Sequence, residues 1–287
     1  MLNVEQTIAG FIIDRKAQGL APGTIRNYTR ELGNFQDYLG DSELTPGLIR
    51  SYLLFLKDEK KRNSGGVHLA YRCIKTWLYW LEREYDNYTA PIRKVKSPRL
   101  NRQPLEPVSL EHVQQLLATC TADYYGIRDK ALILILLDTG VRASALLNVN
   151  LCDVDTDKGT IAVISKGSKA RTLYIGRRTR KALRAWLRLH QEHQPALFTA
   201  YDGIRLGYSG LRLMLTRRSK TAGIGTNVTA HQFRRAFALM MLRSGVDIYT
   251  LAGLMGHSDT RILERYLRLE ANDLELAHRT YSPGDRL

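Results

Sequence analysis

A histidine and an arginine three residues apart form a candidate anion site in the last quarter of the chain. His231 and Arg234 lie in the segment TAHQFRRAFALMM, whose apolar spacing predicts a helix. Side chains with this spacing project from one face of a helix. Because the start of a helix also carries partial positive charge and free N–H groups, the pattern favours an anionic ligand.

Four further residues occur in short motifs that suit phosphate chemistry. Three of them lie beside or close to a glycine, and the fourth follows the glycine–histidine pair by nine residues. They are Arg142, Lys166, His257 and Tyr266. Cleaving a phosphodiester without water requires a nucleophile, cations that neutralise the phosphate oxygens, and a proton for the departing 5′ oxygen. These residue types supply all three. Since fixed cations form the clamp, no metal ion and no other cofactor is expected.

The order of these motifs resembles that of the tyrosine recombinase family, also called the lambda-integrase family. The motifs are TGVRAS, SKGSK, the H-x-x-R pair, and LMGHS followed by a tyrosine, and with the N-terminal segment the resemblance covers nearly the whole chain. It implies six catalytic positions: Arg142, Lys166, His231, Arg234, His257 and Tyr266.

The resemblance also implies a role for each position. Tyr266 attacks phosphorus and forms a 3′-phosphotyrosyl intermediate, which a 5′-hydroxyl of a second strand can reverse. The two arginines hold the phosphate oxygens, and His257 supplies another hydrogen bond. Lys166 is the general acid, while His231 either accepts the tyrosine proton or orients the phosphate. The sequence does not rank these roles.

Some positions have rivals. Tyr249 and Tyr281 are other tyrosines of the second half, but only Tyr266 keeps the family spacing from the second histidine. Lys169 could replace Lys166 as the acid, although the family lysine directly precedes the turn glycine.

The sequence departs from the family at Ala145, where members commonly have an acidic residue, and this affects how the neighbouring histidine is oriented. His190 and His193 have a spacing that can bind metal, but without a third ligand we expect a solvated pair. The three cysteines show no metal or disulfide pattern and are interpreted as core residues: Cys73, Cys120 and Cys152.

The charge of the chain indicates a polyanionic partner. The net charge is +15, with about +5 in residues 1–106 and +10 in residues 107–287. Residues 158–191 contain ten Lys and Arg and no acid, which favours a phosphate-facing surface over a salt-bridged one. The charge therefore favours a nucleic acid over an anionic membrane surface, and the resemblance implies double-stranded DNA as the partner. No membrane is expected, since no apolar run is long enough to span one.

The N-terminal part is predicted to be helical. Apolar spacing, caps and breakers indicate helices over 4–18, 22–39, from 46 to about 56, and 64–84, which form a domain of residues 1–90. It resembles the family's four-helix core-binding (SAM-like) domain. The DNA-binding candidates are cations on the faces of these helices and on the later hairpin: Arg26, Arg30, Arg72, Lys75, Lys169 and Arg171.

A proline-rich basic segment, residues 91–107, is predicted to be an extended linker. Residues 108–287 then form an α+β catalytic domain, so that the whole chain is mainly α with a small antiparallel β-sheet. We predict three strands, near 155, over 160–164 and over 171–175. The first predicted helix of this domain begins near residue 109. The later ones cover 123–138, 142–148, 177–190, 210–222, 231–244, 248–255, 259–269 and 272–278.

The favoured function is a site-specific DNA recombinase that acts as a homotetramer on two sites. Rivals are a type IB topoisomerase-like enzyme and a catalytically impaired DNA-binding regulator on the same fold. We expect a cytoplasmic, nucleoid-associated protein, because the N-terminus lacks a signal peptide. The target sequence stays open, as does the choice between integration, excision and dimer resolution. The tail after residue 272 docks either on its own domain or on a neighbouring protomer.

Overall fold

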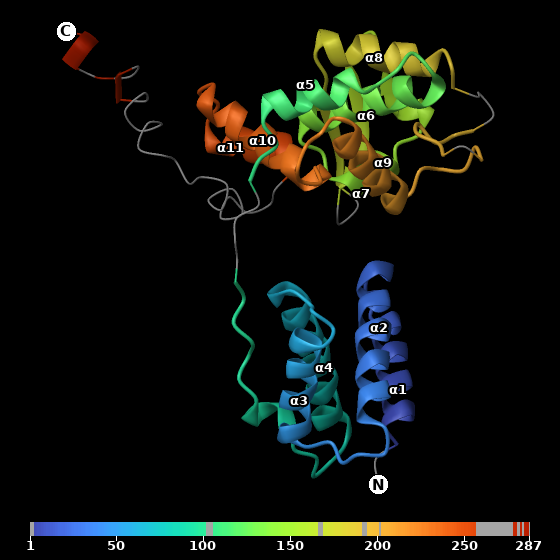
Figure 1. Cartoon of the computed structure of the whole chain (residues 1–287), viewed down its shortest axis with the longest axis vertical. Coiled ribbons are helices and arrows are strands. Elements are labelled where there is room, and N and C mark those ends of the chain that lie inside the picture. The colour runs from blue at the N-terminus through green and yellow to red at the C-terminus, as the bar shows by residue number, and fades with distance from the viewer. Residues whose placement is uncertain are drawn as a thin grey trace. The chain divides into compact units, whose positions relative to one another are not determined.

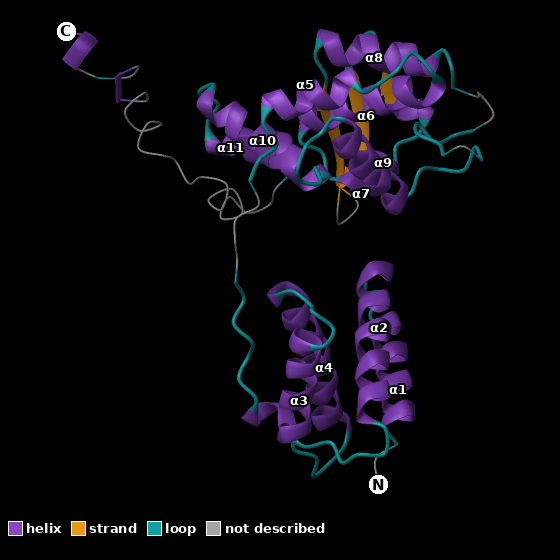
Figure 2. Ribbon diagram, in the orientation of Figure 1, coloured by secondary structure: helices purple, strands orange, loops and turns teal. Residues whose placement is uncertain are grey.

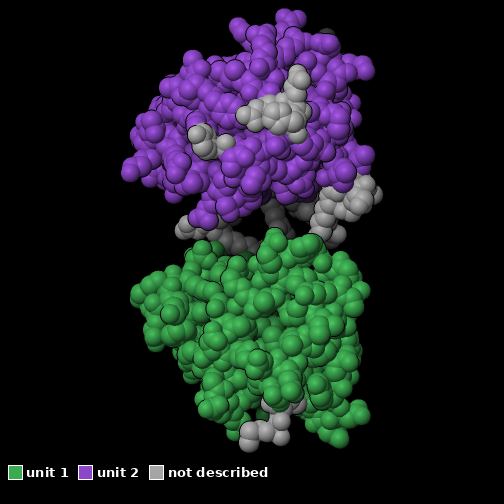
Figure 3. Space-filling model, turned by 90° about the vertical axis from the view of Figure 1, so that its right-hand side faces the viewer, with its two compact units in different colours: residues 1–104 green, residues 105–287 purple. Residues whose placement is uncertain are grey.

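A computed structural model describes residues 3–101, 106–165, 169–190, 194–200, 202–256, 278–279, 282 and 284–286. The chain forms two compact units, Met1–Pro104 and Leu105–Leu287, which are coloured separately in Figure 3. Within the described residues, no helix combines the length and apolar character that a membrane crossing requires.

The N-terminal unit contains four helices, whose predicted positions are confirmed. They are α1 (Val4–Ala17), α2 (Pro22–Leu39), α3 (Pro46–Asp58) and α4 (Ser64–Glu84) (Figure 1). Asn3, Thr45 and Asn63 cap three of them, each accepting a hydrogen bond from a backbone N–H in the first turn. Aromatic side chains fill the core between the helices, and Phe35 contacts both Tyr52 and Trp77 edge to face.

The start of the predicted linker belongs to this N-terminal unit. Pro91–Lys94 forms a short 3₁₀ helix, and Ile92 and Val95 are buried in the core of the unit. The Tyr71 hydroxyl donates a hydrogen bond to the carbonyl of Val95 at 3.1 Å. The cations and prolines around two apolar residues hid this packing in the sequence, so the expectation of a linker that begins at residue 91 is corrected.

The second unit, Leu105–Leu287, contains the six predicted catalytic residues and is called the catalytic unit; it combines helices with a sheet (Figure 2). Its helices are α5 (Leu110–Ala118), α6 (Tyr124–Thr139), α7 (Ala143–Leu147), α8 (Arg177–Leu187), α9 (Tyr208–Thr221), α10 (Ala230–Arg243) and α11 (Ile248–Met255), with short 3₁₀ turns at Leu151–Asp153 and Gly284–Arg286. The strands β1 (Val154–Asp155), β2 (Thr160–Ser165) and β3 (Lys169–Tyr174) form an antiparallel sheet in the order β1-β2-β3. This confirms the predicted three-stranded sheet.

Helix α6 is the centre of the catalytic unit. Its residues from Ala131 to Leu136 are all buried, as expected for a helix that is apolar on every side. Helices α5, α8 and α10 and strand β3 all pack against it. The two helices predicted over 259–269 and 272–278 lie outside the described residues, except for residue 278.

Candidate active site

Three of the six predicted catalytic residues lie in the part of the chain that the structure describes. Arg142 immediately precedes α7 and is half-buried. His231 and Arg234 lie in the first turns of α10, which begins after Thr229 in a capping box. The other three predicted residues lie outside the described residues: Lys166, His257 and Tyr266.

Arg234 joins the ends of two other helices. Its side chain is 3% exposed, and its guanidinium donates one hydrogen bond to the carbonyl of Gly140 at 2.5 Å and one to that of Met255 at 2.9 Å. Gly140 follows α6, and Met255 is the last residue of α11. The orientation of this arginine is therefore fixed by backbone groups at two helix ends.

Arg142 also binds the end of α11. Its guanidinium donates to the carbonyl of Gly256 at 3.3 Å, although 114 residues separate the two in sequence. Both predicted clamp arginines thus bind adjacent carbonyls at the end of α11. The structure brings together two arginines that the sequence could only match to separate motifs.

Two glycines that the sequence analysis used only as motif letters shape this site. Gly140 and Gly256 end α6 and α11 with φ of +54° and +63°, the left-handed conformation that glycine adopts without strain. A Cβ on Gly140 would lie 2.5 Å from the ring of Phe237. Each glycine also presents its carbonyl to an arginine. A glycine directly after a helical pattern was the available signal for such a cap.

The environment of His231 is electropositive. Its side chain is exposed, yet desolvation by the groups packed around the ring lowers its pKa, and the charges on Arg234 and Arg235 lower it further. Ala145, at the position where the family commonly has an acid, packs against the apolar core of the unit. The histidine is thus favoured as the neutral imidazole, which suits a proton acceptor.

The basic outer face of α8 includes ion pairs that the sequence analysis did not expect. Arg184 pairs with the carboxylate of Asp157 at 2.7 Å, and Arg180 donates to the carbonyls of Thr156 and Asp157. Asp157 lies one residue before the acid-free segment, so a count along the sequence missed it. The expectation that residues 158–191 form no salt-bridged surface is therefore corrected.

The DNA-binding candidates differ in environment. The side chains of Arg26 and Arg72 are exposed and, among the described residues, form no hydrogen bond or ion pair. Arg30 pairs with Glu31 at 2.9 Å, and Lys75 lies 5.5 Å from the ring centre of Tyr79. The last two candidates lie on β3: Arg171 donates to a carbonyl at the end of α11, and the side chain of Lys169 is outside the described residues.

The structure also corrects two minor expectations. His190 is buried rather than solvated, because its Nε2–H donates to the carbonyl of Ala196 at 2.8 Å. Cys152 is exposed and is not a core residue, in contrast to buried Cys73. Among the described residues, no group of three or more His, Cys, Asp or Glu could hold a metal ion.

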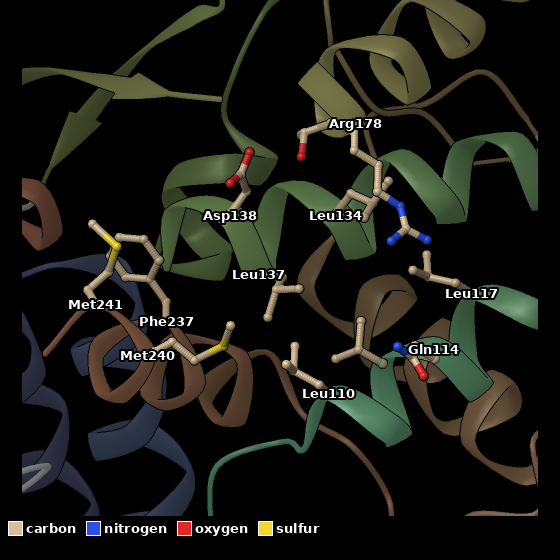
Figure 4. A pocket seen from close by; sticks show the side chains of 12 residues that line it. Leu110, Gln114, Leu117, Leu134, Leu137, Asp138, Arg178, Phe237, Met240 and Met241 are labelled. Carbon is tan, nitrogen blue, oxygen red and sulfur yellow. The ribbon is translucent and has the colours of Figure 1, made fainter. Parts of the chain in front are cut away.

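An apolar pocket lies apart from the arginine cluster, between α5, α6, α8 and α10 (Figure 4). Its volume is about 280 Å³. Leu110 and Met240 line it and are 53% and 39% exposed. The pocket has no nucleophile or cation cluster, and its lining suits an apolar segment of protein chain.

Comparison with known proteins places these observations in a family. The model of the phage integrase family matches residues 108–273. Tyrosine recombinase XerC of Haemophilus influenzae is 27% identical over 266 residues, covering 89% of each chain. Tyrosine recombinase XerD of Oceanobacillus iheyensis is 26% identical over 283 residues, covering 94% of this chain and 95% of that protein.

Solved structures agree on the fold. The Tn1549 transposon integrase, in complex with a circular intermediate DNA, has a TM-score of 0.78 at 18% identity, over 98% of this chain and 100% of that chain. Because recombinases match along almost the full chain, neither the topoisomerase nor the impaired regulator is favoured. The matched family, the two-unit fold and the paired arginines agree: the chain belongs to the phage integrase family and is a tyrosine-type site-specific DNA recombinase.

Proposed function

We propose that the protein cleaves and rejoins duplex DNA through a 3′-phosphotyrosyl intermediate on Tyr266. The observation that supports this most directly is the convergence of Arg142 and Arg234 on neighbouring carbonyls at the end of α11. The chain continues from there to His257 and, nine residues later, to the tyrosine. Two fixed guanidinium groups suit the two non-bridging oxygens of a phosphodiester.

The remaining residues divide the proton transfers between them. Lys166 is the proposed general acid, which gives its proton to the departing 5′ oxygen. His231 accepts the tyrosine proton or orients the phosphate, and its lowered pKa keeps the imidazole neutral for that purpose. His257 adds a hydrogen bond to the phosphate. In this scheme the cations supply the charge stabilisation, so that cleavage needs neither a metal ion nor ATP.

DNA of a specific sequence is the proposed substrate. The Tn1549 integrase, which shares the fold, is in complex with DNA in its structure. Exposed Arg26 and Arg72 on the N-terminal unit are free to contact phosphates, which would position the protein without reading the sequence. The net charge of +15 adds a strong salt-dependent attraction to any duplex.

The nucleophile is tested by Tyr266→Phe, which removes only the attacking oxygen. We expect this variant to form no covalent complex with DNA and to bind DNA nearly as tightly as wild type. The measurement is denaturing electrophoresis of protein incubated with genomic fragments in excess chelator, followed by sequencing of the trapped DNA. Sequencing also reveals the target site.

The matched control is Tyr249→Phe, because Tyr249 is a 77% exposed tyrosine on α11. It should form covalent complexes at the wild-type level. A covalent complex that persists in Tyr266→Phe, or that disappears in the control, would refute the assignment.

We propose that the active assembly is a homotetramer on two sites, joined in part by the C-terminal tail. The segment after residue 272 has a narrow apolar stripe of Leu274 and Ala277, and the apolar pocket between α5 and α10 is a suitable receptor on a neighbouring copy. The alternative is that the tail folds back on its own unit.

Deleting residues 272–287 tests the tail. We expect binding to one half-site to change by less than about threefold, while the fraction of paired sites seen in native gels falls by about tenfold, since a segment that bridges protomers adds avidity. The control removes only residues 282–287, the breaker-rich end SPGDRL. Normal pairing by the longer deletion would exclude docking in trans.

A further inference from the structure

A third arginine joins the two clamp arginines at the end of α11. The carbonyls of residues 254, 255 and 256 accept hydrogen bonds from Arg171, Arg234 and Arg142 respectively. These arginines come from β3, α10 and the start of α7. Three segments that are far apart in sequence are thus tied to three successive backbone groups.

Helix geometry explains why this point attracts cations. The last carbonyls of an α-helix have no partner within the helix and carry the negative end of its dipole. Guanidinium groups that donate to them satisfy these acceptors and hold the helix end in place. The next residue along the chain is His257, so the position of the helix end also sets where that segment of the site begins.

Arg171 fits this place closely. A Cβ on Gly256 would lie 2.9 Å from its Nη1 and 3.1 Å from its Cζ, so the guanidinium would have to shift if this residue carried a side chain. The left-handed φ of Gly256 favours the same residue. The shape of the helix end therefore fixes the Arg171 side chain, in addition to the hydrogen bond.

The environment of Arg171 is not that of a surface phosphate contact. The side chain is half-buried, and its Nε is buried without a hydrogen-bond partner in the described structure. Burial and the charge on Arg142 both lower its pKa. Burying a charged side chain in this way costs free energy. The cost indicates that the hydrogen bond from Arg171 to α11 serves a structural purpose.

The strand that carries Arg171 leads directly to the proposed general acid. Arg171 pairs with Val163 across the β2–β3 ladder, and Ser165 pairs with Lys169 nearer the turn. Lys166 follows Ser165 in the sequence. A constraint on Arg171 is therefore a constraint on the base of the hairpin that bears the lysine.

We propose that Arg171 is a positioning residue that fixes the β2–β3 hairpin against the end of α11. It holds the carbonyls that orient Arg142 and Arg234 and sets the hairpin in register with them. The inference rests on the proposed function only in taking Lys166 and His257 as members of the site. In this proposal Arg171 acts through the end of α11 and not by a contact with the phosphate.

The test compares Arg171→Met and Arg171→Lys with the control Arg180→Met, which also removes a guanidinium bound to backbone carbonyls but on the far turn at Thr156. Three quantities are measured: hydrogen exchange of amides 251–256 in the free protein, half-site affinity by gel shift, and single-turnover cleavage of a duplex carrying the site recovered from the trapped wild-type complex. The exchange measurement does not depend on recombinase activity.

We expect Arg171→Met to speed exchange at the end of α11 by about tenfold and to slow cleavage by about 10- to 100-fold, with affinity within about threefold of wild type. Because the observed link is one N–H to one carbonyl, Arg171→Lys should recover much of the cleavage rate. A bidentate phosphate contact would not be rescued by lysine. Arg180→Met should change none of the three quantities.

Gly256→Ala provides a second route if Arg171→Met does not fold. Its methyl group displaces the guanidinium without removing charge, and we expect the same slow cleavage with retained affinity. Unchanged exchange at residues 251–256 in the Arg171 variants would overturn the proposal whether or not the protein cleaves DNA. A loss of affinity of more than about tenfold with a normal cleavage rate would instead make Arg171 a DNA contact. If the wild-type protein forms no covalent complex with DNA, the proposed function is refuted, whereas the exchange measurement still tests the role of Arg171.

Discussion

The arginines around Glu31 in the N-terminal unit and the clamp arginines of the catalytic unit have different kinds of partner. In the N-terminal unit, Glu31 is only 1% exposed and forms ion pairs with Arg62 at 2.5 Å and Arg30 at 2.9 Å. In the catalytic unit, three hydrogen bonds from Arg142 and Arg234 in the described part of the chain are donated to backbone carbonyls. The first arrangement pairs opposite full charges, whereas the second pairs a full charge with dipoles.

This difference separates stabilisation from catalysis. A carboxylate neutralises an arginine and leaves little attraction for another anion. A carbonyl orients the guanidinium but leaves its formal charge, which is what a phosphate requires. Asp129, which is buried and pairs with Arg128 and Arg218, shows that the catalytic unit also builds neutralised clusters where no phosphate is expected.

The largest effect that should separate the two arrangements is on the clamp arginines. We expect Arg142→Lys and Arg234→Lys each to lower single-turnover cleavage by about 100- to 1,000-fold, because a lysine keeps the charge but cannot reproduce the planar fork. Denaturing gels of covalent complex formation measure the rate. Arg184→Lys is the control, since that arginine pairs with Asp157 at the surface.

Folding of each variant is checked by thermal unfolding, which matters most for Arg234 because it is buried. Cleavage at a near-normal rate by either lysine variant would contradict the bidentate role. It would also remove the distinction between carbonyl-bound and carboxylate-bound arginines.

The next effect is on the stability of the N-terminal unit. Arg62→Leu removes one partner of Glu31 and leaves a buried carboxylate with Arg30 alone. Breaking a buried pair typically costs about 3–5 kcal/mol, and the remaining arginine reduces this, so we expect a loss of about 2 kcal/mol in the free energy of unfolding. The free energy is measured by unfolding the full chain with denaturant and monitoring the N-terminal unit, residues 1–104, by tryptophan fluorescence.

Arg83→Leu is the matched control for that experiment. Its ion pair with Glu84 joins two side chains that are 59% and 41% exposed, so its loss should leave the free energy of unfolding nearly unchanged. Equal effects of the two variants would show that the Glu31 cluster contributes no more than a surface pair. Neither change should alter cleavage by protein that remains folded.

Much of the helical framework could be predicted from the sequence. The predicted limits of α4, Ser64–Glu84, and of α11, Ile248–Met255, agree with the structure. An apolar stripe marks the extent of α4, and Asp247 and Gly256 cap the two ends of α11. The three-stranded sheet was also predictable, since turn residues separate short β-rich runs. Local signals therefore sufficed wherever local interactions decide the element.

The features that could not be predicted depend on long-range contacts or on main-chain atoms. The pair between Asp157 and Arg184 joins two elements across 27 residues, and the packing of Ile92 depends on the finished core of the unit. The acceptors of the clamp arginines are carbonyls, which every residue carries and no motif search can single out. Residue types located the arginines, but only the fold could show what holds them.

The smallest effect concerns the proton on His231, which reports the positive potential around the clamp. Desolvation of the ring and the charges on Arg234 and Arg235 lower its pKa, so the folded protein binds this proton less readily than the unfolded chain. The unfolded state then holds more protons just below the ordinary pKa of about 6.5, and stability falls as the pH drops through that window. Above that window the imidazole is neutral in both the folded and the unfolded state, so this loss of stability is absent.

Arg235→Gln tests this without touching the clamp. Removing that charge should move the pKa of His231 back toward its ordinary value, as followed by the pH titration of its ring C–H resonances in NMR spectra. As the pH falls below about 6.5, the loss of unfolding free energy should be greater in wild type than in His231→Gln, by less than about 1 kcal/mol because solvent screens an exposed group. A His231 pKa in wild type at or above the ordinary value would mean that the site already holds compensating negative charge. The contrast between carbonyl-bound and carboxylate-bound arginines would then fail, because a clamp neutralised before DNA arrives has little attraction left for a phosphate.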